Sequence, residues 1–159
     1  DHRELQITMH VPEDLNVLAD EVELARVISN LLENARRYGK TPDEGITQVE
    51  IAAKGREDWV LIKLRDHGAG VPPEQLGNLT KPFFRGDAAR TAAAGAGLGL
   101  SIVDKTIQRM GGIFALANSS SGGLVAHVQL QRASNQLPGA DLQQRLHRPQ
   151  VKRNLPRKI

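Results

Sequence analysis

The stretch Asp20–Gly39, DEVELARVISNLLENARRYG, decides the fold of this chain. Its apolar residues recur at steps of three and four, which is the period of one buried face of an α-helix. These residues are Leu24, Val27, Ile28, Leu31, Leu32 and Ala35. Asp20 and Glu23 have capping-box spacing at the start, and Gly39 is a typical stop signal. The sequence therefore predicts one long amphipathic helix over this range.

Three polar residues of the same helix lie beside its apolar stripe. Asn30, Asn34 and Arg37 follow one another at steps of four and three, so their side chains share a face. Two carboxamides and a guanidinium can bind a polar, charged ligand, and they can also form an ordinary solvated surface. The helix alone favours a solvated surface. The glycine-rich segments further along the chain favour a ligand.

Composition limits the possible classes of protein. The 159 residues are 40% hydrophobic and only 3% aromatic, which indicates one domain with an aliphatic core. Cysteine is absent, which excludes disulfides and thiolate metal sites. We find no apolar run long enough to span a bilayer and no signal-peptide pattern. The net charge of +3 has its basic excess after Arg132, and the body lacks the basic, aromatic-rich face of a nucleic-acid-binding protein.

Short runs of alternating apolar and polar residues predict the strands of the fold. We expect strands over Leu5–Val11, Leu15–Leu18, Gln48–Lys54, Trp59–Arg65, Ile113–Asn118 and Gly123–Leu130. The third and fourth of these form an antiparallel hairpin. A short helix with proline at its first position is expected over Pro73–Leu79, and apolar spacing predicts a second long helix over Ser101–Met110. This mixture indicates an α+β fold of two layers.

Two glycine-rich segments are candidates for ligand binding. Asp66-His67-Gly68-Ala69-Gly70-Val71-Pro72 follows a strand directly, so Asp66 can accept a hydrogen bond from a ligand amine at the sheet rim. A plain turn explains this segment equally well. Gly95-Ala96-Gly97-Leu98-Gly99-Leu100 leads into a helix, where unpaired amides and the helix dipole favour an anion. Since no strand precedes these glycines, a Rossmann turn is disfavoured.

Two further segments lack regular periodicity. Lys81–Ala94, KPFFRGDAARTAAA, suits a segment that closes over a ligand, although one of its two phenylalanines is more simply a plug for the core. From Ala133 the sequence indicates a flexible basic tail, with a possible short helix over Asp141–His147. A solvated tail is favoured over one that contacts acidic lipid or a partner. We therefore expect a domain over residues 1–132 and a tail over residues 133–159.

Four motifs occur in a specific order: NLLENARRYG, DHGAGVP, KPFFRGD and GAGLGLSIV. Together they resemble the N, G1, F and G2 boxes of the catalytic ATP-binding domain of bacterial sensor histidine kinases, within the GHKL superfamily. The resemblance covers Leu5 to Leu130. Within this family, the sequence looks most like the osmosensor kinases of the OmpR-partner type. It implies a Bergerat-type two-layer α+β sandwich, with a mixed, mostly antiparallel sheet covered on one face by helices.

The resemblance also implies a role for each matching residue of the first two motifs. Asn34 matches the asparagine that holds Mg²⁺ against the ATP phosphates, and Asn30 the second polar position of the N box. Arg37 matches a basic residue near the phosphates, and Tyr38 an aromatic residue packed on adenine. Asp66 matches the acid that accepts from the adenine amino group, in a pocket shaped by neighbouring residues. These neighbours are Gly68, Gly70 and Val71.

The remaining two motifs match the segments that surround the ATP phosphates in members of this family. The glycines of the fourth motif, Gly95, Gly97 and Gly99, match backbone that encloses the phosphates, beside the apolar Leu98 and Leu100. Phe84, Arg85 and Thr91 match residues of the ATP lid. The expected ligands are therefore ATP and Mg²⁺, and the catalytic set is Asn30, Asn34 and Arg37.

The implied activity is donation of the γ-phosphoryl group of ATP to a histidine on a separate dimerisation domain. Gyrase and mismatch-repair relatives carry a glutamate base at the position of Asn30. Because an asparagine side chain cannot take a proton from water, transfer of the phosphoryl group to a protein is favoured over hydrolysis. His2 precedes a strand, and no other histidine has the helical context of an acceptor. A nucleotide-binding module that acts through protein contacts is the alternative.

The resemblance finally implies a setting for this activity. We expect a monomeric catalytic fragment of a homodimeric kinase, acting on an OmpR-like response regulator through the full-length protein. Its expected location is the cytoplasmic side of an inner-membrane protein.

Overall fold

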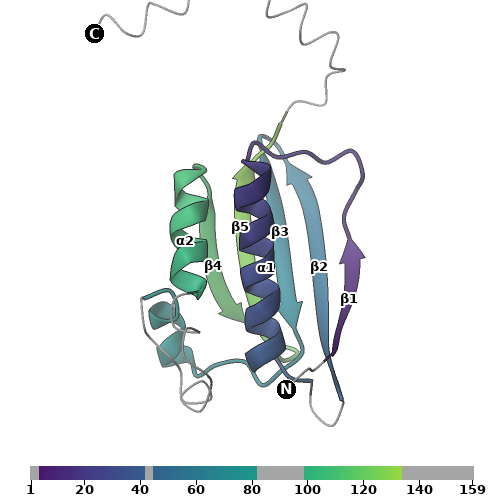
Figure 1. The fold of residues 1–159 in the computed structure, drawn as a ribbon, viewed down its shortest axis with the longest axis vertical. Coiled ribbons are helices and arrows are strands. Elements are labelled where there is room, and N and C mark those ends of the chain that lie inside the picture. Colours follow the sequence, from purple (N-terminus) through teal and green to yellow (C-terminus); the bar gives the residue numbers. More distant parts are fainter. Residues whose placement is uncertain (1–3, 42–44, 82–98, 134–159) are drawn as a thin grey trace, which may run out of the picture.

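A computed structural model describes residues 4–41, 45–81 and 99–133 of the chain. Figure 1 shows a sheet with its helices on one face. The elements are β1 (Glu4–His10), α1 (Glu21–Tyr38), β2 (Ile46–Arg56), β3 (Trp59–Asp66), the 3-10 helix η1 (Pro73–Asn78), α2 (Gly99–Arg109), β4 (Ile113–Asn118) and β5 (Leu124–Gln131). The predicted α+β class is confirmed, because both layers are present.

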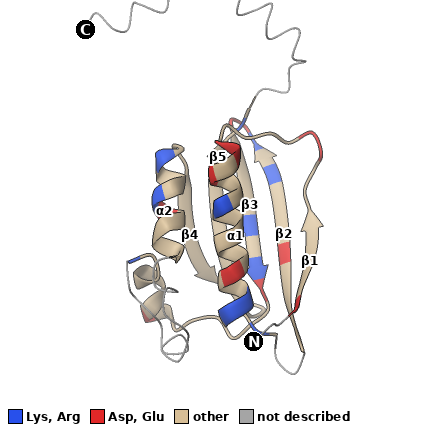
Figure 2. Cartoon of the chain, in the orientation of Figure 1, with Lys and Arg blue, Asp and Glu red and all other residues tan. Residues whose placement is uncertain are grey.

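The first long helix forms as its sequence predicts. The Asp20 carboxylate accepts from the backbone amide of Glu23 at 2.9 Å, and the Gly39 amide donates to the Ala35 carbonyl at 2.8 Å. Acidic side chains lie in the first turn of α1 and basic ones in its last turn (Figure 2), which suits the helix dipole. The expected apolar stripe is the buried one, since it includes Val27 and Leu31.

The sheet has the strand order β1-β2-β3-β5-β4. Only β1 and β2 run parallel among these pairs, and the other three pairs are antiparallel. The predicted hairpin is confirmed by the β2–β3 register, in which Val49 pairs with Asp66 and Arg56 with Trp59. A mixed, mostly antiparallel sheet is therefore confirmed as well.

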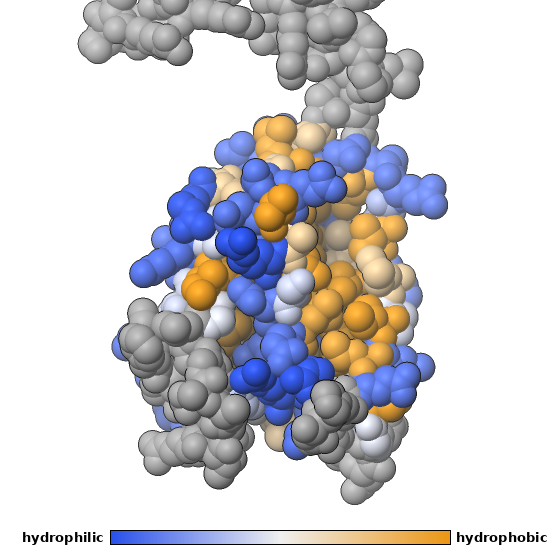
Figure 3. All heavy atoms as spheres, viewed as in Figure 1, coloured by the Kyte–Doolittle hydropathy of each residue, from blue (hydrophilic) through white to orange (hydrophobic). Residues whose placement is uncertain are grey.

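The core lies between the sheet and the two long helices. Val60 and Leu130 from the sheet are buried, as are Val103 and Ile107 from α2. At the β1 edge, the apolar side chains remain uncovered beside α1 (Figure 3). Aliphatic side chains dominate this core, as the low aromatic content predicts.

Two predicted elements differ from the observed ones. Leu15–Leu18 is not a strand, because Val17 makes only an isolated bridge with Arg132. The short helix after Pro72 is a 3-10 helix, Pro73–Asn78. Most of the expected lid and the segment after Ala133 lie outside the described residues. Within the described ranges, no helix has the length and apolar character that crossing a membrane requires.

Candidate functional site

The two long helices run antiparallel, which brings the described residues of the predicted site to one end of the molecule. At the opposite end, Arg109 Nη2 of α2 donates to Glu23 Oε2 of α1 at 3.3 Å. Asn34 lies eleven residues after Glu23, and Gly99 lies ten residues before Arg109. At 1.5 Å per residue these are rises of roughly 16 and 15 Å. The second half of α1 and the start of α2 therefore lie at the same level (Figure 1).

Asp66 ends β3 at this same end of the fold. Its side chain is buried, and Oδ1 accepts hydrogen bonds from the backbone amides of Gly68 at 2.9 Å and Leu124 at 3.1 Å. Among the described residues, no hydrogen bond reaches Oδ2. One carboxylate oxygen is thus fixed by the backbone, and the other remains an acceptor for a ligand.

Three glycines pack directly against Asp66 and its loop. A Cβ on Gly39 would lie 2.5 Å from Asp66 Cβ, and one on Gly68 would lie 2.8 Å from the Gly39 carbonyl carbon. Gly123 has φ +88°, and a Cβ there would overlap the Asp66 carbonyl oxygen. From the sequence, Gly39 was predicted only as a helix end, and the contact of Gly123 with Asp66 was not predicted. The Ser/Gly composition of its turn was the available signal for Gly123.

Asn30 and Asn34 are both partly exposed on α1. Neither carboxamide has a hydrogen-bond partner within residues 4–41, 45–81 and 99–133, so both are available to a ligand. The described residues also contain no cluster of three or more His, Cys, Asp or Glu that could hold a metal. A carboxamide oxygen together with oxygens of the ligand itself is a suitable set for Mg²⁺, which keeps several waters.

Arg37 is held in place by Glu33, a residue that the sequence analysis missed. Glu33 Oε1 accepts from Arg37 Nε at 2.8 Å and from Arg36 Nη2 at 2.6 Å. Hydrogen bonds from Arg36, and then from Arg37, lower the pKa of Glu33 to about 2 against the opposing effect of burial. The hydrogen bond to Glu33 raises the pKa of Arg37. The i, i+4 spacing of Glu33 and Arg37 was the signal that could have found this pair.

Two buried hydroxyl groups near this end lack partners in the described structure. They belong to Tyr38, the last residue of α1, and Thr47, near the start of β2. Thr47 lies two residues before Val49, the partner of Asp66 in the sheet. Since a buried polar atom without a hydrogen bond is costly, these groups fit a site that receives polar atoms from a ligand.

The loop after Asp66 is fixed by Asn118 at the end of β4. Asn118 Oδ1 accepts from the Val71 amide at 3.0 Å, and its Nδ2 donates to the Val71 carbonyl at 2.6 Å. Gly70 has φ +73°, and a Cβ there would lie 2.6 Å from Asn118 Oδ1. Asn118 therefore sets the position of Gly70 and Val71, and no local pattern in the sequence indicated this.

The start of α2 completes the described part of the site. Leu100 is buried, and a Cβ on Gly99 would have nothing within 4 Å, so the backbone there is accessible. Several residues of the sequence-based site lie outside the described residues and stay predictions. They are Phe84, Arg85, Thr91, Gly95, Gly97 and Leu98.

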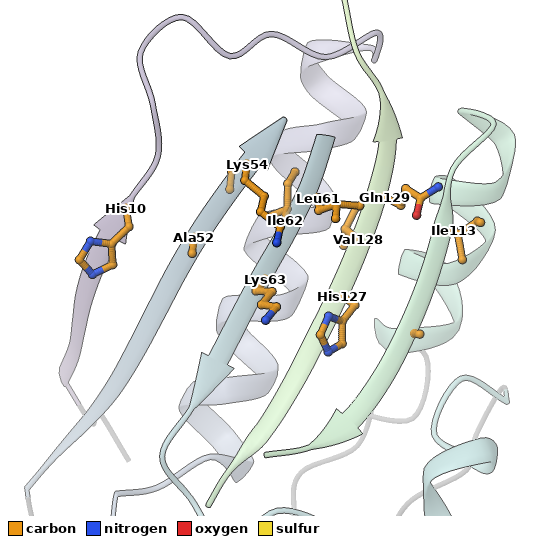
Figure 4. A pocket seen from close by; sticks show the side chains of 12 residues that line it. His10, Ala52, Lys54, Leu61, Ile62, Lys63, Ile113, His127, Val128 and Gln129 are labelled. Atoms are coloured by element: carbon orange, nitrogen blue, oxygen red, sulfur yellow. The ribbon is translucent and has the colours of Figure 1, made fainter. Parts of the chain in front are cut away.

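A hollow crosses the face of the sheet that the helices leave uncovered (Figure 4). Lys54, Lys63 and His127 point into it. Burial and then the charge of Lys63 lower the pKa of His127. None of the predicted site residues lines this hollow, and the site at the end of α1 remains the candidate.

Comparison with known proteins agrees with the fold and the motifs. The sensor protein VanS of Enterococcus faecium is 38% identical over 117 residues, which are 72% of this chain and 29% of VanS. The structure of the mycobacterial sensor histidine kinase MprB has TM-score 0.69 and 25% identity, covering 80% of this chain and 84% of that one. Full-length ShkA in complex with AMPPNP has TM-score 0.66 and 26% identity, covering 82% of this chain and 26% of that one.

The match has a defined extent. The chain spans about a quarter of the length of the curated relatives, 23% for Hik2 of Synechocystis and 27% for BaeS of Escherichia coli. The family described as histidine kinase-, DNA gyrase B-, and HSP90-like ATPase matches residues 19–134. This range includes α1, the Asp66 loop and α2. The predicted resemblance is confirmed, and the chain belongs to the histidine kinase-, DNA gyrase B-, and HSP90-like ATPase family.

Proposed function

We propose that this chain is the ATP-binding catalytic domain of a sensor histidine kinase, which donates the γ-phosphoryl group of ATP to a histidine on a separate dimerisation domain. The observation that carries the proposal is the buried carboxylate of Asp66. One of its oxygens is fixed by two backbone amides and the other has no donor among the described residues. It lies at the end of the fold that Asn34 and the start of α2 share.

In this proposal Asp66 Oδ2 accepts a hydrogen bond from the amino group of adenine. The glycine backbone at Gly39, Gly68 and Gly123 leaves the space against Asp66 that side chains would fill. The same carboxylate would repel a carbonyl oxygen, so it selects adenine over guanine. ShkA, a structural relative in complex with AMPPNP, is consistent with an adenine nucleotide here.

The phosphates extend toward Asn34 and Gly99. Asn34 supplies a carboxamide oxygen to Mg²⁺, which neutralises phosphate charge when it is bound. Amides at the start of α2 point toward an anion, as at other helix N-termini. Arg37, which is held by Glu33, places a positively charged side chain on the same helix face as Asn34.

Asn30 distinguishes transfer from hydrolysis. Its carboxamide can orient a group by hydrogen bonding but cannot take a proton from an attacking water. A nucleophile from another protein therefore fits this site better than water. The sensor histidine kinases among the relatives support a histidine as that nucleophile.

The proposal extends to the wider setting of the chain. Residues 1–132 form the catalytic unit in this proposal, and residues 133–159 are a separate basic segment. The catalytic unit itself is monomeric, and the parent kinase is a homodimer on the cytoplasmic side of an inner membrane. Its response regulator is of the OmpR type.

The test uses the chain, γ-labelled ATP with Mg²⁺, and the separately expressed dimerisation domain of the parent kinase. Acid-labile phosphate should appear on the dimerisation domain and not on the chain alone. Nucleotide binding without transfer would favour a binding module that acts through protein contacts. Release of phosphate without the second domain would favour an ATPase of the gyrase type.

A further inference from the structure

An exposed apolar surface lies along β1 and its connection to α1. Five of the seven large apolar side chains that are exposed in the described ranges lie between residues 7 and 22. They are Ile7 (42% exposed), Met9 (63%), Val11 (42%), Leu18 (54%) and Val22 (67%), and we call them the apolar edge. Exposed apolar surface gathered in one place is typical of an interaction site.

The apolar edge faces the helical side of the sheet. Ile7 and Met9 pair in the sheet with Val49 and Ile51, both of which are buried. Cross-strand partners point to the same face, so Ile7 and Met9 point toward the helix layer. Figure 3 shows this apolar surface uncovered beside α1. Within the described residues, no helix covers this face of β1.

The charged residues of the segment that carries the apolar edge are all acidic. Residues 4–22 contain five carboxylates and no lysine or arginine. The carboxylates are Glu4, Glu13, Asp14, Asp20 and Glu21. Figure 2 shows acidic residues on the connection between β1 and α1 and at the start of α1. A segment that covers this surface should combine apolar residues with positive charge.

The chain leaves the described structure next to this surface. The Leu18 amide donates to the Gln131 carbonyl at 2.8 Å, and the Ala133 amide donates to the Asn16 carbonyl at 2.9 Å. These bonds hold the end of β5 against the connection between β1 and α1. Ala133, the last described residue, therefore lies beside the connection that carries Leu18, a member of the apolar edge.

The sequence after Ala133 has the required composition. Residues 134–159 carry six Lys or Arg and only one acidic residue, Asp141. Their six apolar residues larger than alanine, apart from proline, are Leu137, Leu142, Leu146, Val151, Leu155 and Ile159. Leu142 and Leu146 would share one face of the short helix expected over Asp141–His147. At roughly 3.3 Å per residue in extended form, the segment can easily reach along β1.

We propose that residues 134–159 dock on the apolar edge of the same chain. Leu142 and Leu146 cover the apolar side chains of β1, while Arg145 and Arg148 face the surrounding carboxylates. The hollow on the open face of the sheet is a poorer location, because Lys54 and Lys63 line it and would repel the segment. This docking needs no nucleotide, so it stands independently of the proposed function.

The test places one spin label in the full chain. Because the chain has no cysteine, Gln144→Cys creates a single attachment point. In the oxidised, paramagnetic state the label should broaden the amide resonances of residues 7–11 and 18–22. Raising the salt concentration should weaken this effect, since the contact pairs opposite charges. Absence of selective broadening at these residues would overturn the proposal and leave the apolar edge to a separate partner.

Two controls make the result specific. The same labelled chain with Leu142→Gln and Leu146→Gln should lose the broadening, because its apolar contacts are removed. Contacts between copies are measured in a mixture of two chains. One chain carries the spin label but no ¹⁵N, and the other carries ¹⁵N but no spin label. Broadening of equal size in this mixture would show that a second copy occupies the surface, and would overturn docking within one chain.

Discussion

Gly39, the C-cap residue that follows α1, lies against the side chain of Asp66, the residue that ends β3. A Cβ on Gly39 would lie 2.5 Å from both Cβ and Cγ of Asp66. The helix that carries Asn30, Asn34 and Arg37 is therefore in direct contact with the strand that carries the buried acid. This contact joins two motifs that lie far apart in the sequence into one candidate site.

Asp66→Asn should weaken ATP binding by roughly ten- to a hundredfold. The new carboxamide oxygen can still accept from the amides of Gly68 and Leu124, so the fold is retained. Its NH₂ group then faces the adenine amino group, and two donors that meet leave both unsatisfied, at a cost of about 1–3 kcal/mol. Calorimetric titration with ATP measures the change. Asp58→Asn, in the exposed turn before β3, is the matched control and should bind ATP normally.

Asn34→Ala should abolish the part of the ATP affinity that depends on Mg²⁺. The substitution removes a carboxamide oxygen and leaves a good helix former in its place, so α1 stays intact. Titrations with Mg²⁺ and with EDTA separate the two contributions. Ser29→Ala, on an exposed position of the same helix, should leave both titrations unchanged. Equal affinity of Asn34→Ala and wild type in Mg²⁺ would remove Asn34 from the site.

Much of this fold follows from local pattern. The periodicity of α1 and the alternation in β2, β3, β4 and β5 are local properties, and each predicted the element that forms. Asp66 was also identifiable, because an acid directly followed by glycines at the end of a strand is visible in the sequence. The 3-10 form of η1 was not, because a short segment that starts with proline suits both helix types.

The missed features depend on distant parts of the chain. Gly123 contacts Asp66 across 57 positions of sequence, and Asn118 fixes Val71 across 47. Turn composition shows that such residues end a strand but does not show which loop they meet. Val17 likewise forms a bridge with Arg132 and not a strand, because its partner comes from the far end of the described chain.

Gly123→Ala should destabilise the fold by at least about 2 kcal/mol. The residue has φ +88°, which costs a residue with a Cβ about 1–3 kcal/mol, and the added carbon would also overlap the Asp66 carbonyl oxygen. Urea unfolding measures the loss. A Cβ on Gly77 would have nothing within 4 Å, so Gly77→Ala is the control. Equal effects of the two substitutions would mean that Gly123 is not closely packed.

Glu33→Gln should reduce the dependence of stability on acidic pH. The pKa of Glu33 is about 2 in the folded chain, held down first by the hydrogen bond from Arg36, against an ordinary value of 4.5. Its contribution is therefore complete above pH 4.5 and is lost as the pH falls toward 2. Because the side chain is 45% exposed, we expect at most about 1 kcal/mol. Urea unfolding at a series of pH values should show a shallower decline for Glu33→Gln than for wild type.

The same variant tests whether Glu33 positions Arg37. Glutamine keeps a neutral acceptor but removes the charge from the 2.8 Å contact with Arg37, so the weaker contact lets the guanidinium sample more orientations before ATP arrives. ATP affinity should then fall modestly at pH 7, while the Mg²⁺-dependent part, which depends on Asn34, should persist. Glu74→Gln, on the exposed surface of η1, should change neither the pH series nor the titration. If Glu33→Gln bound ATP as tightly as wild type, Glu33 would not position Arg37 for ATP binding.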